Sequence, residues 1–187
     1  MSQRNQASPS EPWHGFFREL DTAATEEVDL QCVGGFVVTE MYGLARPTAD
    51  IDVLSIAPVA QRSELLKMGG EGSQLHQKYG VYLQYVGGIV SLPYDYDERL
   101  VPMFQGAYKH LRFFALDPYD LVLSKLERNQ PKDRQDVLFL ARAIPLHLNI
   151  LKQRYPELRP QLFGVKENFD ANFELWLEMI EEDRRRS

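Results

Sequence analysis

Hydrophobic residues follow a helical spacing at both ends of the chain and a strand-like pattern between them. Apolar side chains recur three and four positions apart within Trp13–Leu30, which predicts a helix before the first strand. A short apolar helix is predicted over Phe36–Met41, with Gly43 as its C-terminal cap, and a broken helix over Arg62–Leu75. The predicted strands are Leu30–Val33, Ile51–Ile56, Val81–Val86 and Leu111–Leu116.

The pattern becomes helical after Leu116. Asp117 and Pro118 are typical of the cap and first residue of a helix, and this helix is expected to include Leu126. Further helices are predicted over Lys132–Ala143, Ile144–Tyr155 and Glu167–Arg185. We therefore expect an α/β (α+β) fold, with a small mixed sheet flanked by helices and a C-terminal helical group. The expected divisions are a mobile tail (1–12), a core (13–116) and a helical region packed on that core (117–187).

Composition narrows the class of protein. The chain has 187 residues, of which 44% are hydrophobic and 26% charged, as expected for one globular domain with a helical appendage. It contains neither an apolar run of membrane-spanning length nor an apolar signal core, and its one cysteine, Cys32, lies within a predicted strand. These features favour a cytoplasmic protein. The net charge of -6 argues against a broadly basic surface for nucleic acid.

Two carboxylates open the second predicted strand. Asp50 and Asp52 are two residues apart, so an extended backbone turns both to the same side. Such a pair repels itself unless a cation compensates it, and Mg²⁺ (or Mn²⁺) bridging to phosphate oxygens is the usual cation. Gly34 and Gly35 precede the short helix and allow a triphosphate to approach the backbone closely. The pattern predicts a metal-assisted nucleotide site.

The order of these features is more specific than any one of them. Asp-x-Asp alone is common, and Gly-Gly alone usually marks a turn. Strand, Gly-Gly, short helix, then Arg46 and Thr48 before the acid pair together resemble the nucleotidyltransferase superfamily related to DNA polymerase beta. The resemblance implies that Asp50 and Asp52 hold the catalytic metal. It also makes the two glycines, Arg46 and Thr48 candidates for nucleotide binding.

A second group of charged residues lies in Leu116–Leu140. Asp133 and Asp136 are three apart and share a helix face, and Lys125 lies across a short turn from them. Charged residues on paired helices usually form solvated faces. A lysine near triphosphate oxygens would instead offset negative charge, and a nearby carboxylate would orient the lysine or accept a proton.

This second stretch resembles AbiEii-type nucleotidyltransferase toxins and related bacterial proteins. The resemblance places Lys125 at the family's active-site lysine, and Asp133 and Asp136 at its Asp-x-x-Asp. It implies a nucleoside triphosphate as substrate, with RNA or protein as acceptor, and a role in a toxin–antitoxin pair. An antitoxin or a second copy of the chain is the expected partner, and no membrane is expected.

One departure bears on catalysis. Many active nucleotidyltransferases carry a third carboxylate on the strand that follows the acid pair, but here alternation places Tyr82 and Gln84 on the corresponding face. An amide accepts a hydrogen bond but adds no negative charge. Asp95 and Asp97 follow Pro93 and are expected in a loop or helix entry rather than at the metal.

Two functions from different classes remain. The first is metal-dependent transfer of a nucleoside monophosphate to a hydroxyl of RNA, protein or a small molecule. The second is a catalytically weakened, nucleotidyltransferase-like protein that binds a nucleotide or a partner protein. Gln84 and the apolar C-terminal helix support the second.

Overall fold

The structure is a computed structural model, and it describes residues 7–186 of the chain. The chain forms two compact units. The sheet unit contains the described residues up to Ile89 together with Leu100–Leu116, and the helical unit contains Val90–Arg99 together with the chain from Asp117 onward. No helix within residues 7–186 is both long enough and apolar enough to cross a membrane.

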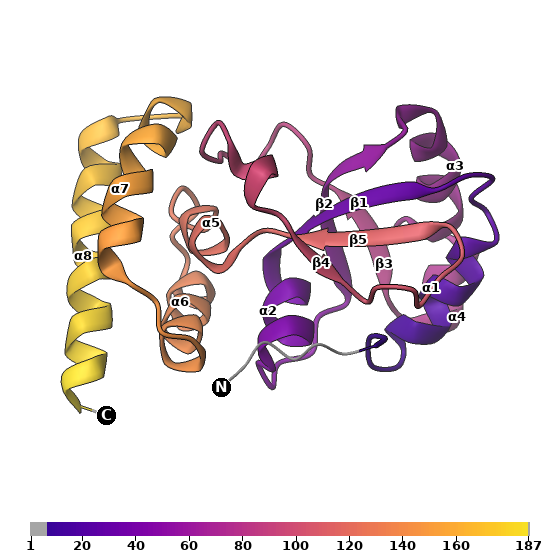
Figure 1. The fold of residues 1–187 in the computed structure, drawn as a ribbon, viewed down its shortest axis with the longest axis horizontal. Helices are drawn as coiled ribbons and strands as arrows, with labels where there is room; N and C mark the ends of the chain where they lie inside the picture. Colours follow the sequence, from indigo (N-terminus) through magenta and orange to yellow (C-terminus); the bar gives the residue numbers. More distant parts are fainter. Residues whose placement is uncertain (1–6, 187) are drawn as a thin grey trace. The chain divides into compact units, whose positions relative to one another are not determined.

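The sheet unit is built on one five-stranded sheet (Figure 1), in the order β3-β2-β1-β5-β4. Strands β1 and β5 are parallel, as are β2 and β3, whereas β1–β2 and β4–β5 are antiparallel. The strands are β1 (Val28–Val33), β2 (Asp50–Ala57), β3 (Tyr82–Tyr85), β4 (Val101–Met103) and β5 (Leu111–Ala115). The helices of this unit are α1 (Trp13–Asp21), α2 (Gly34–Tyr42), α3 (Val59–Gly69) and α4 (Gln74–Tyr79). A mixed sheet flanked by helices confirms the predicted fold class.

An aromatic core attaches α1 and α2 to the sheet. Phe17 of α1 lies 4.6 Å, centroid to centroid, from Phe113 of β5, and Trp13 lies 4.9 Å from Phe36 of α2. All four side chains are buried. Because aromatic residues bury large apolar areas, this cluster fixes α2 against the strands and thereby positions the start of α2.

A β-bulge in β2 decides which way the acid pair faces. Ile56 and Val53 are three residues apart, yet they pair with β1 residues that are only two apart, and both are fully buried. In a regular strand Asp52, four residues from Ile56, would share its buried face. The extra residue at Leu54 reverses the alternation, so that Asp50 and Asp52 point away from the core.

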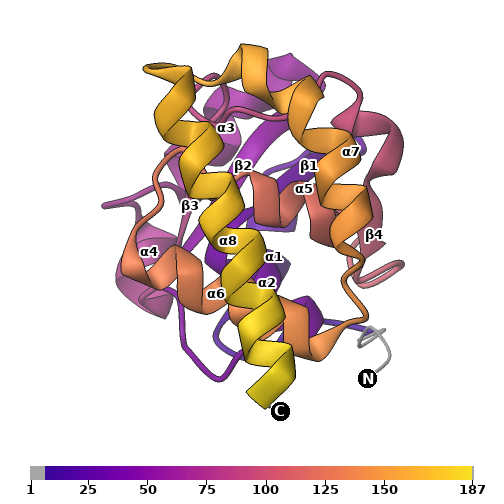
Figure 2. The same cartoon turned by 90° about the vertical axis from the view of Figure 1, so that its left-hand side faces the viewer.

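In its described residues, the helical unit contains four α-helices and two short 3₁₀ segments. These elements are η1 (Tyr96–Arg99), α5 (Pro118–Leu123), α6 (Pro131–Ala143), α7 (Leu148–Leu158), η2 (Arg159–Gln161) and α8 (Lys166–Arg186). Helix α8 crosses α6 (Figure 2), and Tyr155 of α7 stacks on Phe173 of α8 with ring centroids 4.1 Å apart. The amphipathic C-terminal helix is confirmed, and its apolar face is buried within this unit.

An ion pair joins Val90–Arg99 to the C-terminal helices, and a second ion pair within those helices shares its carboxylate. Arg99 Nε lies 2.8 Å from Asp120 Oδ2, and Arg154 Nη1 lies 3.0 Å from Asp120 Oδ1. The Asp120 side chain is fully buried, which raises its pKa, and the hydrogen bond from Arg99 only partly offsets that effect. The helical unit therefore includes a segment that precedes the expected division at Asp117.

Several predicted boundaries were wrong. Helix α1 ends at Asp21, whose carboxylate accepts hydrogen bonds from the backbone N–H groups of three residues around β5, and Val28 belongs to β1. Helix α5 ends at Leu123, so Leu126 lies in the turn that follows. Strand β4 was not predicted. The Gly43 cap is confirmed, with a left-handed φ of 81°. Of the expected mobile tail, residues 1–6 lie outside the described residues.

Candidate functional site

The acid pair lies beside the first turn of α2. Gly34 has a φ of +82°, and a Cβ atom at this position would lie 2.4 Å from Asp52 Oδ2. Glycine is therefore required here for both its backbone conformation and the closeness of the carboxylate. Asp52 is also the register partner of Val33, the residue that caps α2. The structure therefore places Asp52 directly beside Gly34.

Arg46 and Thr48 lie against the second glycine. A Cβ on Gly35 would be 3.6 Å from Thr48 Oγ1 and 4.0 Å from Arg46 Nη2. The loop that carries both residues is tied to α2, because Thr39 Oγ1 donates a 3.0 Å hydrogen bond to the Arg46 carbonyl. The structure thus gathers Gly34, Gly35, Arg46, Thr48 and Asp52 from three separate parts of the sequence.

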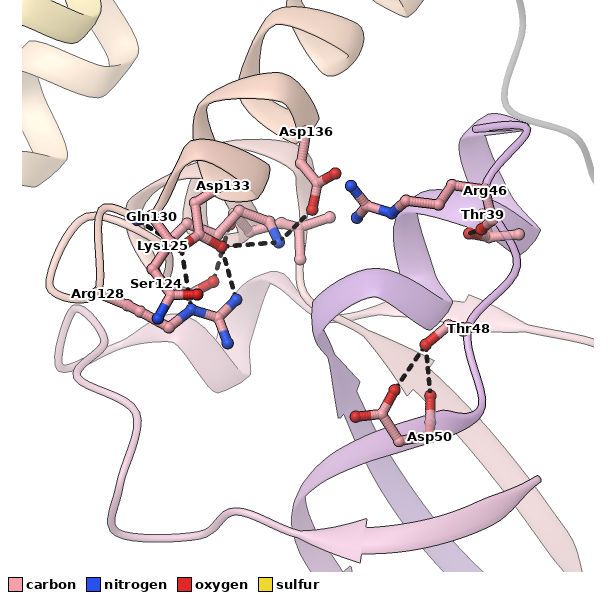
Figure 3. Close-up of polar contacts among 11 residues, drawn as sticks. Thr39, Arg46, Thr48, Asp50, Ser124, Lys125, Arg128, Gln130, Asp133 and Asp136 are labelled. Carbon is pink, nitrogen blue, oxygen red and sulfur yellow. Dashed lines mark hydrogen bonds and ion pairs between the residues drawn. The ribbon is translucent and has the colours of Figure 1, made fainter. Parts of the chain in front are cut away.

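Thr48 also orients one member of the acid pair (Figure 3). Its hydroxyl lies 2.6 Å from Asp50 Oδ1 and 3.2 Å from the Asp50 carbonyl oxygen. A hydroxyl has one proton, and the shorter contact to the charged oxygen is the stronger hydrogen bond. Thr48 was predicted to bind nucleotide, and the contacts found here are those of a residue that positions Asp50.

Gln84 occupies the position on β3 where the resemblance to active nucleotidyltransferases predicts a third carboxylate. Strand β3 pairs with β2 in parallel, with Asp52 opposite Gln84 and Asp50 opposite Tyr82. Paired residues on neighbouring strands share a face, so Gln84 and not Leu83 lies beside the acid pair. Leu83 is buried on the core side. The predicted orientation of Gln84 is confirmed.

The charge of the acid pair acts on its neighbours. Burial raises the pKa of the Tyr82 phenol, and the negative charges of Asp50, Glu71 and Asp52 raise it further. Burial also raises the pKa of the Cys32 thiol, and the negative charge of Asp52 raises it further. Cys32 is fully buried and protonated at neutral pH, which confirms it as a packing residue and excludes a thiolate nucleophile.

The site suits a hard divalent cation shared with a substrate. Asp50 and Asp52 supply the carboxylate oxygens that Mg²⁺ or Mn²⁺ prefers, and the close fit of Asp52 against Gly34 holds one of them beside a helix start. Within residues 7–186, no three His, Cys, Asp or Glu side chains gather closely enough to enclose a metal ion. A bound ion would therefore take its remaining ligands from phosphate oxygens and water, as Mg²⁺ commonly does.

The second charged group forms inside the helical unit. Lys125 Nζ lies 2.8 Å from Asp136 Oδ2 and 4.0 Å from Asp133 Oδ1 (Figure 3), and the lysine side chain is only 3% exposed. The predicted pairing of Lys125 with these acids is confirmed. That this group shares a cleft with Asp50 stays a prediction.

Asp133 has structural partners of its own. Its carboxylate accepts two hydrogen bonds from Arg128 and one from the Gln130 N–H, at the start of α6. Burial opposes its ionisation, but the bonds from Arg128 and Gln130, with the charge of Lys125, lower the pKa of Asp133 overall. Of the two acids, Asp136 is thus the one whose contact is directed at the lysine.

Asp95 and Asp97, which follow Pro93, lie at the entry to a short helix, as predicted. Asp95 immediately precedes η1, and Asp97 lies exposed within it. Asp95 Oδ2 is 2.6 Å from Arg99 Nη1, and this hydrogen bond lowers the pKa of Asp95. A lowered pKa makes Asp95 a weaker base, which disfavours it as a replacement for the acid missing from β3.

A mixed sheet with Gly-Gly at a helix start and an acid pair on the neighbouring strand fits the resemblance to nucleotidyltransferases that the sequence shows. The chain belongs to a family of this class, described as nucleotidyltransferase of unknown function (DUF6036), whose model matches residues 16–185. No curated protein and no solved structure matches the chain. The narrower resemblance to AbiEii-type toxins stays a prediction.

Proposed function

We propose that this protein transfers a nucleoside monophosphate from a nucleoside triphosphate to a hydroxyl acceptor, with Asp50 and Asp52 holding Mg²⁺ or Mn²⁺. The observation that carries the proposal is the acid pair itself, which a bulge turns out of the core beside the glycine start of α2. Membership of a nucleotidyltransferase family supports a triphosphate as substrate.

Different groups of the chain have separate roles in the proposed reaction. The start of α2 offers phosphates backbone N–H groups that lack carbonyl partners in the helix, and Gly34 lets the Asp52 carboxylate lie against that helix start. Arg46 lies near enough to Gly35 to offset phosphate charge, and Thr48 keeps Asp50 in one orientation. The metal, when bound, supplies charge neutralisation for the phosphate oxygens.

The reaction forms one bond and breaks another. The acceptor oxygen bonds to the α-phosphorus, the bond to the β-phosphate breaks, and pyrophosphate leaves with the electron pair. The acceptor proton passes to a base or to solvent. The proposed role of Lys125 is to stabilise phosphate charge, and the proposed role of Asp136, or Asp133, is to orient that lysine.

The acceptor we favour is RNA or protein, and a toxin of a toxin–antitoxin pair is the biological role that the sequence resemblance favours. A direct test is to incubate purified protein with each α-labelled ribonucleoside triphosphate, total RNA and Mg²⁺. We expect label in RNA or in protein, and loss of that label on chelation with EDTA. No labelled product with any triphosphate, and no Mg²⁺-dependent nucleotide binding, would contradict the proposal.

A weakened enzyme is the second candidate, and Gln84 beside Asp52 is the observation that favours it. Gln84→Glu adds a carboxylate to the same face of the sheet, so we expect faster transfer, by about tenfold or more. Gln31→Glu is a suitable control because Gln31 lies on β1 and pairs with Ser55, which is further along β2 than Asp52. Equal rates for the parent and Gln84→Glu would show that this position does not limit catalysis.

A further inference from the structure

A phenol stands beside the acid pair on the side away from α2. Tyr82 is the register partner of Asp50, so its side chain shares the face of the two acids. Strand β2 has β1 on one flank and β3 on the other, and α2 follows directly from β1. The acid pair therefore lies between the glycine start of α2 and the Tyr82 side chain.

Tyr82 is held in place through its ring. The ring centroid lies 4.8 Å from that of His76 in α4, and the His76 ring is itself fixed by a 2.8 Å hydrogen bond from the Gly72 N–H to Nδ1. The Ser73 hydroxyl caps α4 by accepting from the His76 N–H. Within residues 7–186, burial and the charges of Asp50, Glu71 and Asp52 act on the Tyr82 phenol and no hydrogen bond does, which leaves its hydroxyl available to a ligand.

The geometry of in-line displacement indicates on which side of the acid pair each reactant lies. The attacking oxygen and the leaving pyrophosphate lie on opposite sides of the reacting phosphorus. If the phosphates lie at the start of α2, beside Gly34 and Gly35, the acceptor approaches from β3. The β3 side chains there are Tyr82 and Gln84, both uncharged and both able to donate and to accept hydrogen bonds.

We propose that Tyr82 is an acceptor-binding residue, whose phenol hydrogen-bonds the incoming hydroxyl beside Asp50. This inference rests on the proposed function and adds the side from which the acceptor enters. A fixed phenol orients the attacking oxygen without repelling it, whereas a third carboxylate would also remove its proton. The subsite suits an uncharged hydroxyl group, such as that of a ribose or of a serine, threonine or tyrosine side chain.

The test compares Tyr82→Phe with Tyr79→Phe. Both changes remove one phenolic oxygen. The Tyr79 hydroxyl, at the end of α4, donates to Glu19 of α1, 2.6 Å away. For Tyr82→Phe, we expect kcat/KM for the RNA or protein acceptor to fall about tenfold, in keeping with one lost hydrogen bond. The Kd for the triphosphate with Mg²⁺ should stay within about twofold, since the phosphates lie on the other side. Tyr79→Phe should match the parent in both quantities.

A second measurement does not need an identified acceptor. In purified protein labelled with 3-fluorotyrosine, the resonance that disappears in Tyr82→Phe should shift when total RNA is added to the complex with Mg²⁺ and a non-hydrolysable triphosphate. The resonance assigned through Tyr79→Phe should not move. An unmoved Tyr82 resonance, or an unchanged acceptor kcat/KM in Tyr82→Phe, would overturn this inference and leave transfer at Asp50 and Asp52 standing. Failure of the proposed function would instead appear as absent Mg²⁺-dependent nucleotide binding by the parent.

Discussion

Gly34→Ala is expected to lower the Mg²⁺-dependent affinity for nucleotide by at least about tenfold, because an added Cβ would lie 2.4 Å from Asp52 Oδ2. The carboxylate must move or the start of α2 must shift, and either change separates groups that bind one ligand. The left-handed backbone at φ +82° adds about 1–3 kcal/mol of strain for any residue with a side chain. Affinity is measured by calorimetric titration, and stability by urea unfolding.

Gly88→Ala is the matched control for Gly34→Ala. Gly88 has nearly the same φ, +83°, and a Cβ there would meet nothing within 4 Å. Both variants should lose stability through the left-handed backbone, and Gly34→Ala should lose more because of its contact with Asp52, but only Gly34→Ala should lose nucleotide affinity. Equal nucleotide affinities for the two variants would contradict the placement of the nucleotide at the start of α2.

Lys125→Ala is expected to lower the free energy of unfolding of the helical unit by about 3–5 kcal/mol. The lysine side chain is 3% exposed and lies 2.8 Å from Asp136, so its removal takes a positive charge from beside a buried carboxylate. The measurement is urea unfolding followed by circular dichroism. This expected loss has a consequence for function, because lower activity in Lys125→Ala would not by itself identify a catalytic lysine.

Two further variants separate the causes of that loss. Lys132→Ala removes an exposed lysine from α6 and should change stability by less than about 0.5 kcal/mol. The double variant Lys125→Met with Asp136→Leu removes both charges and should recover much of the stability that Lys125→Ala loses. A Lys125→Ala variant as stable as the parent would contradict the buried pair.

The acid pair was predictable from the sequence, but the reason for its orientation was not. Strict alternation from the buried Ile56 places Asp52 in the core, and only the extra residue at Leu54 turns it outward. A bulge depends on pairing with another strand, which the local pattern does not contain. The shared face of Tyr82 and Gln84 did follow from alternation, because β3 is regular over its length.

The helical unit shows the same difference between local and distant information. The start of α5 at Asp117 and Pro118 was read from adjacent residues, since the Asp117 carboxylate caps the helix by accepting from nearby N–H groups. The inclusion of Val90–Arg99 in this unit depends on Arg99 meeting Asp120, 21 positions away. No pattern within either segment indicates that contact.

The most direct test of the central claim is calorimetric titration of Asp52→Asn with Mg²⁺ and a non-hydrolysable ribonucleoside triphosphate. Asp97→Asn serves as control, because Asp97 is an exposed acid of the helical unit. If Asp50 and Asp52 hold the metal, Asp52→Asn should lose at least about 100-fold in affinity with little change in stability, and Asp97→Asn should bind as the parent does. Equal Mg²⁺-dependent affinity for Asp52→Asn and the parent would contradict the nucleotide site.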